Sequence, residues 1–154
     1  SGAGDIQPPP GTPLSGVSTK IADAWTAAER ALVRVHALRP RERLVVWEKE
    51  DATGDAVSRY RAIAEAGGVA QLAAEYRIGA LYHDLAISLL VEPLAADLRR
   101  TLRPGAYGFL KKAITAYKAS LAVGVPAHEM DSVWRLAAQS DMRAAQDVLG
   151  EAAQ

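Results

Sequence analysis

The sequence predicts an all-α fold. Hydrophobic residues make up 49% of the 154-residue chain and charged residues 23%, the balance of a soluble globular protein. Apolar residues recur at helical spacing, and no segment alternates with period two over the length of a strand. Alanine, the strongest helix former, is abundant. We therefore expect seven or eight helices, arranged as an array of helical hairpins or as an orthogonal bundle around one core.

The first 17 residues form a segment rich in proline, glycine and serine. Its three consecutive prolines, at 8–10, favour an extended polyproline II conformation. We interpret residues 1–17 as a flexible linker or tail, in preference to a recognition motif. The single domain is then expected over residues 18–150, with a short tail at 151–154.

Four helices are expected in the first 91 residues. Ser18 or Thr19 can cap the first, which ends before Pro40. Thr53–Gly54 is expected to form a turn between the second and third helices, and Gly67–Gly68 a turn before the fourth. The fourth is apolar on two sides, so we expect it at the centre of the structure. The predicted ranges are about 19–38, 41–51, 55–66 and 69–91.

Four more helices are expected in the rest of the chain. A short helix follows Pro93, and a long one begins near Pro104, because a proline without its N–H is harmless in a first turn. The glycine and proline of residues 124–126 end that long helix. The predicted ranges are about 93–102, 104–122, 127–138 and 141–149.

Small and large residues recur at intervals typical of helices that pack closely in pairs. The three groups are Ala28, Leu32, Val35 and Pro40; Ile78, Gly79 and Tyr82; and Ala113, Tyr117 and Ser120. Their pattern resembles the tetratricopeptide repeat, a helix–turn–helix unit, although the groups are too far apart to form one complete repeat. The resemblance is to a degenerate array over about residues 20–150. It implies a groove between helices that holds a protein or peptide.

No motif in the sequence supports catalysis. The chain has no cysteine, which excludes disulfides and thiolate metal sites. His83 and Asp84 point about 100° apart on a helix, so we interpret His83 as a core or interface histidine. His128–Glu129 lacks the spacing of an HExxH site and is interpreted as a helix N-terminus. We predict no catalytic residue, no metal site and no cofactor.

The charges are unevenly distributed although the net charge is zero. Residues 98–128 contain six basic residues and no acidic one. A basic face of this kind attracts an acidic partner, unless it pairs with the acidic segment at 44–97. The pI near 6.8 disfavours nucleic acid as the partner, because a nucleic-acid-binding domain is expected to carry an excess of positive charge. The predicted partner-binding residues are Tyr82, Tyr107, Lys111, Lys112, Lys118, Arg99, Arg100 and Arg103.

We predict a non-catalytic interaction or scaffolding module of a larger protein or complex. The alternatives are a small ligand-binding or enzymatic domain with a pocket around Tyr76, Tyr82 and His83, and a domain that self-associates. The longest apolar run, at 78–91, is too short and too polar to span a membrane. The bias toward arginine and alanine suggests GC-rich bacterial coding, and we expect a cytoplasmic location, with a periplasmic or surface-tethered one as the alternative. The oligomeric state is not predicted.

Overall fold

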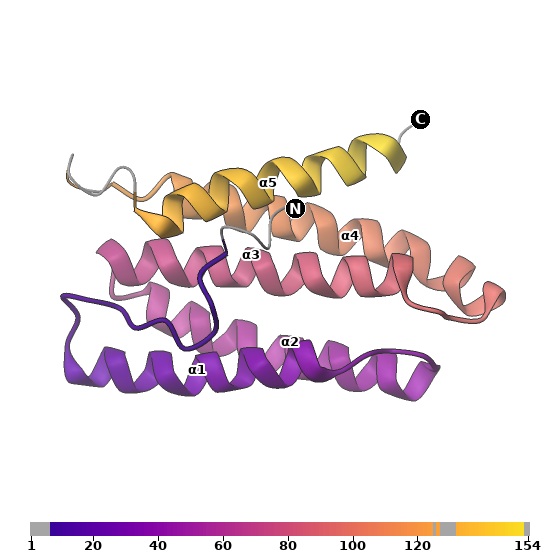
Figure 1. The fold of residues 1–154 in the computed structure, drawn as a ribbon, viewed down its shortest axis with the longest axis horizontal. Coiled ribbons are helices and arrows are strands. Elements are labelled where there is room, and N and C mark those ends of the chain that lie inside the picture. Colours follow the sequence, from indigo (N-terminus) through magenta and orange to yellow (C-terminus); the bar gives the residue numbers. More distant parts are fainter. Residues whose placement is uncertain (1–6, 125, 127–131, 153–154) are drawn as a thin grey trace.

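The computed structural model describes residues 7–124, 126 and 132–152, which form five helices and no strand (Figure 1). The all-α class is confirmed, but the predicted count of seven or eight helices is wrong, because three pairs of predicted helices are continuous. The helices are α1 (Thr19–Ala37), α2 (Arg43–Ala64), α3 (Gly68–Val91), α4 (Ala96–Leu121) and α5 (Val133–Ala152).

The turn predicted at Thr53–Gly54 lies inside α2. The buried Thr53 hydroxyl donates to the Lys49 carbonyl at 2.7 Å, so its side chain is satisfied within the helix. Gly54 faces open space. A glycine in a helix costs only about 1 kcal/mol relative to alanine. The buried residues on both sides of Gly54, including Lys49, Val57 and Tyr60, hold the helix together across it.

Pro104 lies inside α4 and does not begin a helix. A proline in a helix interior costs roughly 3 kcal/mol, because it removes one hydrogen bond and crowds the preceding turn. Packing on both sides of Pro104 offsets that cost. Leu98 and Leu102 before it and Ala106 after it contact one apolar cluster, which also contains Val46, Leu85, Leu89 and Leu94.

The two helices predicted at 127–138 and 141–149 also differ in the structure. Residues 133–152 form the single helix α5, which passes through Ser140 and Asp141 without a break. The predicted start at 127–131 lies outside the described residues, as do His128 and Glu129. Asp141 is buried in α5, where a helix start had been expected.

Helix α3 lies at the centre and contacts the other four helices, which confirms the position expected for residues 69–91. It packs most extensively against α4. A Cβ atom added to Gly79 would lie 2.5 Å from Cδ1 of the buried Tyr117 ring. Glycine at this position therefore lets the tyrosine ring pack directly on the α3 backbone.

The N-terminal segment 7–17 is part of the packed structure. In Figure 1 its indigo trace crosses α3 between α5 and α1 before α1 begins. Pro8 is buried, and Leu14 and Val17 pack against the main core. This segment, which the sequence suggested to be a linker, covers the central helix where the candidate site lies.

Candidate functional site: a groove that holds a proline-rich segment

Residues 9–12 form a β-turn at the centre of the segment. The Thr12 amide donates to the Pro9 carbonyl at 3.1 Å, and the Thr12 hydroxyl donates to the same oxygen at 2.6 Å. Pro10 and Gly11 occupy the two central positions, and Gly11 has a φ of +88°. Proline followed by a glycine with positive φ is the pattern of a type II turn. The turn fixes which main-chain groups face the helices.

Two buried charged residues lie beneath this turn. Arg77 on α3 and Glu29 on α1 are 1% and 3% exposed in their side chains. The Arg77 guanidinium binds the Glu29 carboxylate through two parallel bonds, from Nε to Oε2 at 3.0 Å and from Nη2 to Oε1 at 2.7 Å. The Tyr60 hydroxyl on α2 also donates to Oε2. The pair therefore joins three helices in a fixed geometry.

The same two side chains bind the main chain of the segment. Arg77 Nη1 donates to the Pro8 carbonyl at 2.9 Å, and Nη2 donates to the Pro9 carbonyl at 3.1 Å. Glu29 Oε1 accepts the Gly11 amide at 3.0 Å. Nearby, the Trp25 indole Nε1 donates to the Thr12 carbonyl at 2.8 Å. Four main-chain groups of the segment are thus recognised by side chains of α1 and α3.

Aromatic rings surround the Arg77 guanidinium. Its central carbon lies 5.0 Å from the Trp134 ring centroid and 5.9 Å from those of Trp25 and Tyr76. These distances allow cation–π attraction, which is strongest away from water. The pKa of Tyr60 is raised by burial and by the neighbouring Glu29 charge, so its hydroxyl stays protonated and keeps donating to that carboxylate.

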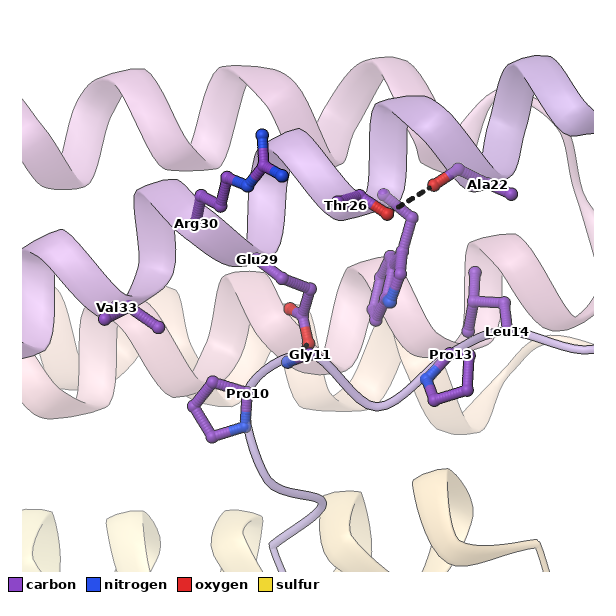
Figure 2. A pocket seen from close by; sticks show the side chains of 10 residues that line it. Pro10, Gly11, Pro13, Leu14, Ala22, Thr26, Glu29, Arg30 and Val33 are labelled. Atoms are coloured by element: carbon purple, nitrogen blue, oxygen red, sulfur yellow. Dashed lines mark hydrogen bonds between the residues drawn. The ribbon is translucent and has the colours of Figure 1, made fainter.

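An apolar pocket of about 290 Å³ remains between the segment and α1. Figure 2 shows Pro10, Pro13 and Leu14 on one side of it and Val33 on the helix opposite. Val33 is 51% exposed and contributes apolar surface to this pocket. The segment thus leaves part of the apolar surface of α1 uncovered.

A second, polar cleft of about 320 Å³ begins where the segment reaches Gln7. His83 on α3 lines it, with Nδ1 3.0 Å from the Tyr117 hydroxyl. Asp141 on α5 also lines it, and its Oδ2 accepts the Tyr76 hydroxyl at 2.6 Å. Burial lowers the pKa of His83 and raises the pKa of Asp141 to about 6.

The structure does not bring Tyr76, Tyr82 and His83 to one pocket. Tyr76 is fully buried beneath Asp141, and His83 lines the polar cleft. Tyr82 lines a different groove, of about 460 Å³, together with Lys111 and Lys112. Tyr82 therefore lies apart from Tyr76 and His83, which both contact the Tyr117 ring.

The groove at Tyr82 gathers three of the predicted partner-binding residues. The Tyr82 ring stacks on Phe109 of α4, with centroids 6.1 Å apart and planes 11° from parallel. Lys112 Nζ lies 5.5 Å from the Tyr82 centroid. Arg61 and Glu75 also line the groove. We call this surface the basic groove, and define it by Arg61, Glu75, Ile78, Tyr82, Lys111, Lys112, Thr115, Ala116 and Ala119.

The other predicted partner-binding residues lie elsewhere. Arg99 donates to the Glu92 carbonyl at 2.8 Å, and Arg100 pairs with Asp97 at 3.6 Å on the surface. Tyr107 is partly buried against the main core. Arg103 and Lys118 are exposed and do not line the basic groove.

Sequence reasoning missed the buried charges. Glu29 lies four residues after Trp25 and three before Leu32, on the apolar stripe of its helix. Arg77 falls within the apolar helix 69–91. A charge on a stripe that must be buried indicates a buried partner, and this signal could have found both residues. The Pro10–Gly11 pair is likewise a turn signature.

Lys49 is a third buried charge, and its role is structural. Its Nζ donates to the carbonyls of Val35 and Leu38 at 3.0 Å each and lies 2.8 Å from Asp84 Oδ2. A cation is favourable at the C-terminal end of a helix, where carbonyls lack partners. Lys49 thus fixes the end of α1 against α2 and α3.

Among the described residues, no cluster of three or more histidine, aspartate or glutamate side chains could hold a metal ion. Within the same part of the chain, every helix is too short or too polar to cross a membrane. No protein-family model matches the chain, and neither a curated protein nor a solved structure matches it significantly.

Proposed function

We propose that the chain is a non-catalytic interaction module, whose groove between α1, α3 and α5 binds an extended, proline-containing segment. The observation that carries this proposal is the use of a buried ion pair to bind main-chain atoms. Arg77 and Glu29 make three hydrogen bonds to residues 8–11. Those bonds require the segment's backbone shape, which its prolines and Gly11 determine.

Energetics support a recognition role for the ion pair. A buried ion pair stabilises a core no better than well-packed apolar residues of the same volume, because both charges lose their hydration. Arg77 and Glu29 instead supply donors to two carbonyls and an acceptor to one N–H. Apolar side chains could not do this. A buried main-chain carbonyl needs a hydrogen-bond donor, and Arg77 supplies one to Pro8.

The chemistry of the groove also fits the proposed ligand. Proline-rich segments bind in aromatic-lined grooves, where their preformed extended shape lowers the entropic cost of binding. Here Trp25 supplies both a ring surface and an N–H donor to Thr12. The chain's own segment occupies the groove, so a partner segment of the same chemistry would compete with residues 7–14 for it.

The basic groove is a second candidate surface of the same module. Arg61, Lys111 and Lys112 outnumber the single acidic residue, Glu75. No acidic residue of the described chain forms an ion pair with Lys111 or Lys112. These observations favour an acidic peptide as the partner at this surface.

The test of the proline groove is a titration with a fluorescent peptide of residues 7–17. The receptor is the full chain with Pro8→Asp and Gly11→Val. These substitutions weaken the docking of its own N-terminal segment and change no residue of a helix. We expect saturable binding by anisotropy, weaker apparent binding to the unaltered chain, and none of a peptide with both substitutions. If the altered chain keeps its helical circular dichroism and does not bind the peptide, the proposal is wrong.

A further inference from the structure

The polar cleft beside Gln7 has one feature that the proline groove does not explain. Asp141 is 1% exposed, and its Oδ2 is satisfied by Tyr76. Its Oδ1 is buried and has no hydrogen-bond partner among the described residues. A buried acceptor without a partner destabilises the fold, and it does so more when it is charged. An acceptor left in this state at the edge of a cleft is open to a donor from a water molecule or from a ligand.

The charge balance around the cleft identifies the sign of that ligand. The three cations that act on the side chains of the cleft are already paired: Arg77 with Glu29 at 2.7 Å, Lys49 with Asp84 at 2.8 Å, and Arg39 with Glu92 at 3.1 Å. The carboxylate of Asp141 is therefore the uncompensated charge in this part of the described chain. A group that carries both a positive charge and N–H donors would restore the balance.

The histidines of the cleft do not supply that charge. Burial lowers the pKa of His83 and the pKa of His36, so both rings are neutral at neutral pH. The His83 ring is held by the Tyr117 hydroxyl. Neutral imidazoles can accept or donate one hydrogen bond to a ligand without repelling a cation.

The size and walls of the cleft set the remaining limits. Its volume of about 320 Å³ is at the lower end of the range for small-molecule sites. Ala80 and Ile87 give it apolar wall beside the polar groups. Side chains from α1, α3, α4 and α5 converge there, with Gln7 of the N-terminal segment at the edge.

We infer that this cleft binds a small organic cation, whose ammonium or guanidinium group donates to Asp141 Oδ1 and whose alkyl part lies against Ala80 and Ile87. Of the residues that line the cleft, only Gln7 belongs to the N-terminal segment, and the Tyr76–Asp141 hydrogen bond is separate from the Arg77–Glu29 pair. A metal ion is not the expected ligand, because the described histidine and carboxylate groups do not gather three ligands.

The experiment is a titration of the full chain with n-butylammonium, n-butylguanidinium and neutral n-butanol. Binding is measured by calorimetry and by the NMR signals of the His83 ring. We expect saturable binding of at least one cation, with a shift of the His83 signals, and no matching response to n-butanol. Equal binding of n-butanol, or no saturable binding of either cation, would overturn the inference.

Two variants locate the site. Asp141→Asn should lower the affinity about 10- to 100-fold, because hydrogen bonds to charged groups contribute about 1.5–3 kcal/mol. Asp147→Asn, an exposed change on the same helix, should have no effect. Ile87→Trp, which fills the cleft but keeps Asp141, should abolish binding. It tests the location of the site even if Asp141→Asn fails to fold. Unchanged affinity in Ile87→Trp would place the cation elsewhere.

Discussion

Arg77 and Glu29, which are 48 positions apart in the sequence, form a buried two-bond ion pair whose outer atoms bind the backbone of the N-terminal segment. The pair links the fold to the proposed function. It joins α3 to α1, and it also orients Pro8, Pro9 and Gly11. Changes to the pair should therefore affect stability and segment docking separately.

Arg77→Met should lower the free energy of unfolding by about 3–5 kcal/mol, because it leaves the Glu29 charge buried without a partner. Glu29→Leu combined with Arg77→Met should recover much of that loss, because both charges are then absent. The double variant should still release residues 8–12. Urea unfolding measures the first effect, and the rate of proteolysis within the segment measures the second.

The exposed pair of Arg59 with Asp55 provides the control for these variants. Arg59→Met removes an ion pair of 3.1 Å on the surface, where such pairs contribute at most about 1 kcal/mol. It should leave both stability and proteolysis nearly unchanged. Equal stability losses in the single and double variants of the buried pair would show that the charges are not coupled as described.

Gly79→Ala should destabilise the protein by about 1–3 kcal/mol, because the new methyl group would meet the buried Tyr117 ring at 2.5 Å. Gly54→Ala is the matched control within another helix. Its Cβ would face open space, so it should stabilise by about 0.5–1 kcal/mol. Thermal unfolding of the two variants measures both effects. A neutral Gly79→Ala would contradict the close packing of α3 on α4.

Asp141 should give the stability a distinctive pH dependence. Its pKa is raised from 3.8 to about 6 in the folded protein, so folding favours the protonated form. The stability contribution of this group is therefore greatest at low pH and is lost as the pH rises through about 6. At neutral pH the buried charge of Asp141 therefore lowers the free energy of unfolding by about 3 kcal/mol, since each pKa unit corresponds to about 1.4 kcal/mol.

Comparing Asp141→Asn with the unaltered chain isolates this effect. His36 and His83 act in the opposite direction, because burial lowers their pKa values and their contribution is lost as the pH falls below 6.5. Both histidines remain in the variant, so the difference between the two stability curves reports Asp141. We expect that difference to change between pH 4 and pH 6, as measured by urea unfolding. A flat difference would show that Asp141 is not buried as a charge.

Reversing the charge of Lys111 and Lys112 to glutamate should weaken binding of a glutamate-rich peptide about tenfold, because each exposed ion pair contributes up to about 1 kcal/mol. The binding should also weaken with added salt. Lys118→Glu is the control, since Lys118 lies outside the basic groove. An equal effect of Lys118→Glu in calorimetry would mean that general charge, and not the groove, attracts the peptide.

The sequence predicted the helical class and most helix ends, because these depend on local periodicity and capping. The Ser18 side chain does accept the Ile21 amide at the start of α1. The sequence could not predict that helices continue through Gly54 and Pro104, because the packing that offsets the cost of a glycine or proline inside a helix comes from distant residues. The resemblance to the tetratricopeptide repeat stays a prediction, although Gly79 and Tyr117 do pack together as small and large residues of paired helices.

The candidate site was predicted less well than the fold. The sequence shows the charge run at 98–128 and shows Tyr82 as a candidate contact residue, but only the structure brings Tyr82 next to Lys111 and Lys112. The proline groove was not visible in the sequence, because it depends on contacts between residues 8–12 and side chains far along the chain. An extended segment without periodicity contains little information about what it packs against, and the pairing of Glu29 with Arg77 is visible only in three dimensions.

The most direct test of the proline groove is the indole N–H signal of Trp25 in NMR spectra of the chain with Pro8→Asp and Gly11→Val. Trp25 Nε1 donates to Thr12 in the docked state, so the signal should move in this variant. Adding the unlabelled peptide of residues 7–17 should return it to its position in the unaltered chain. The exposed Trp47 on α2 should not move in either step. A Trp25 signal that is unaffected by the substitutions, or by saturating peptide, would contradict the proposed groove.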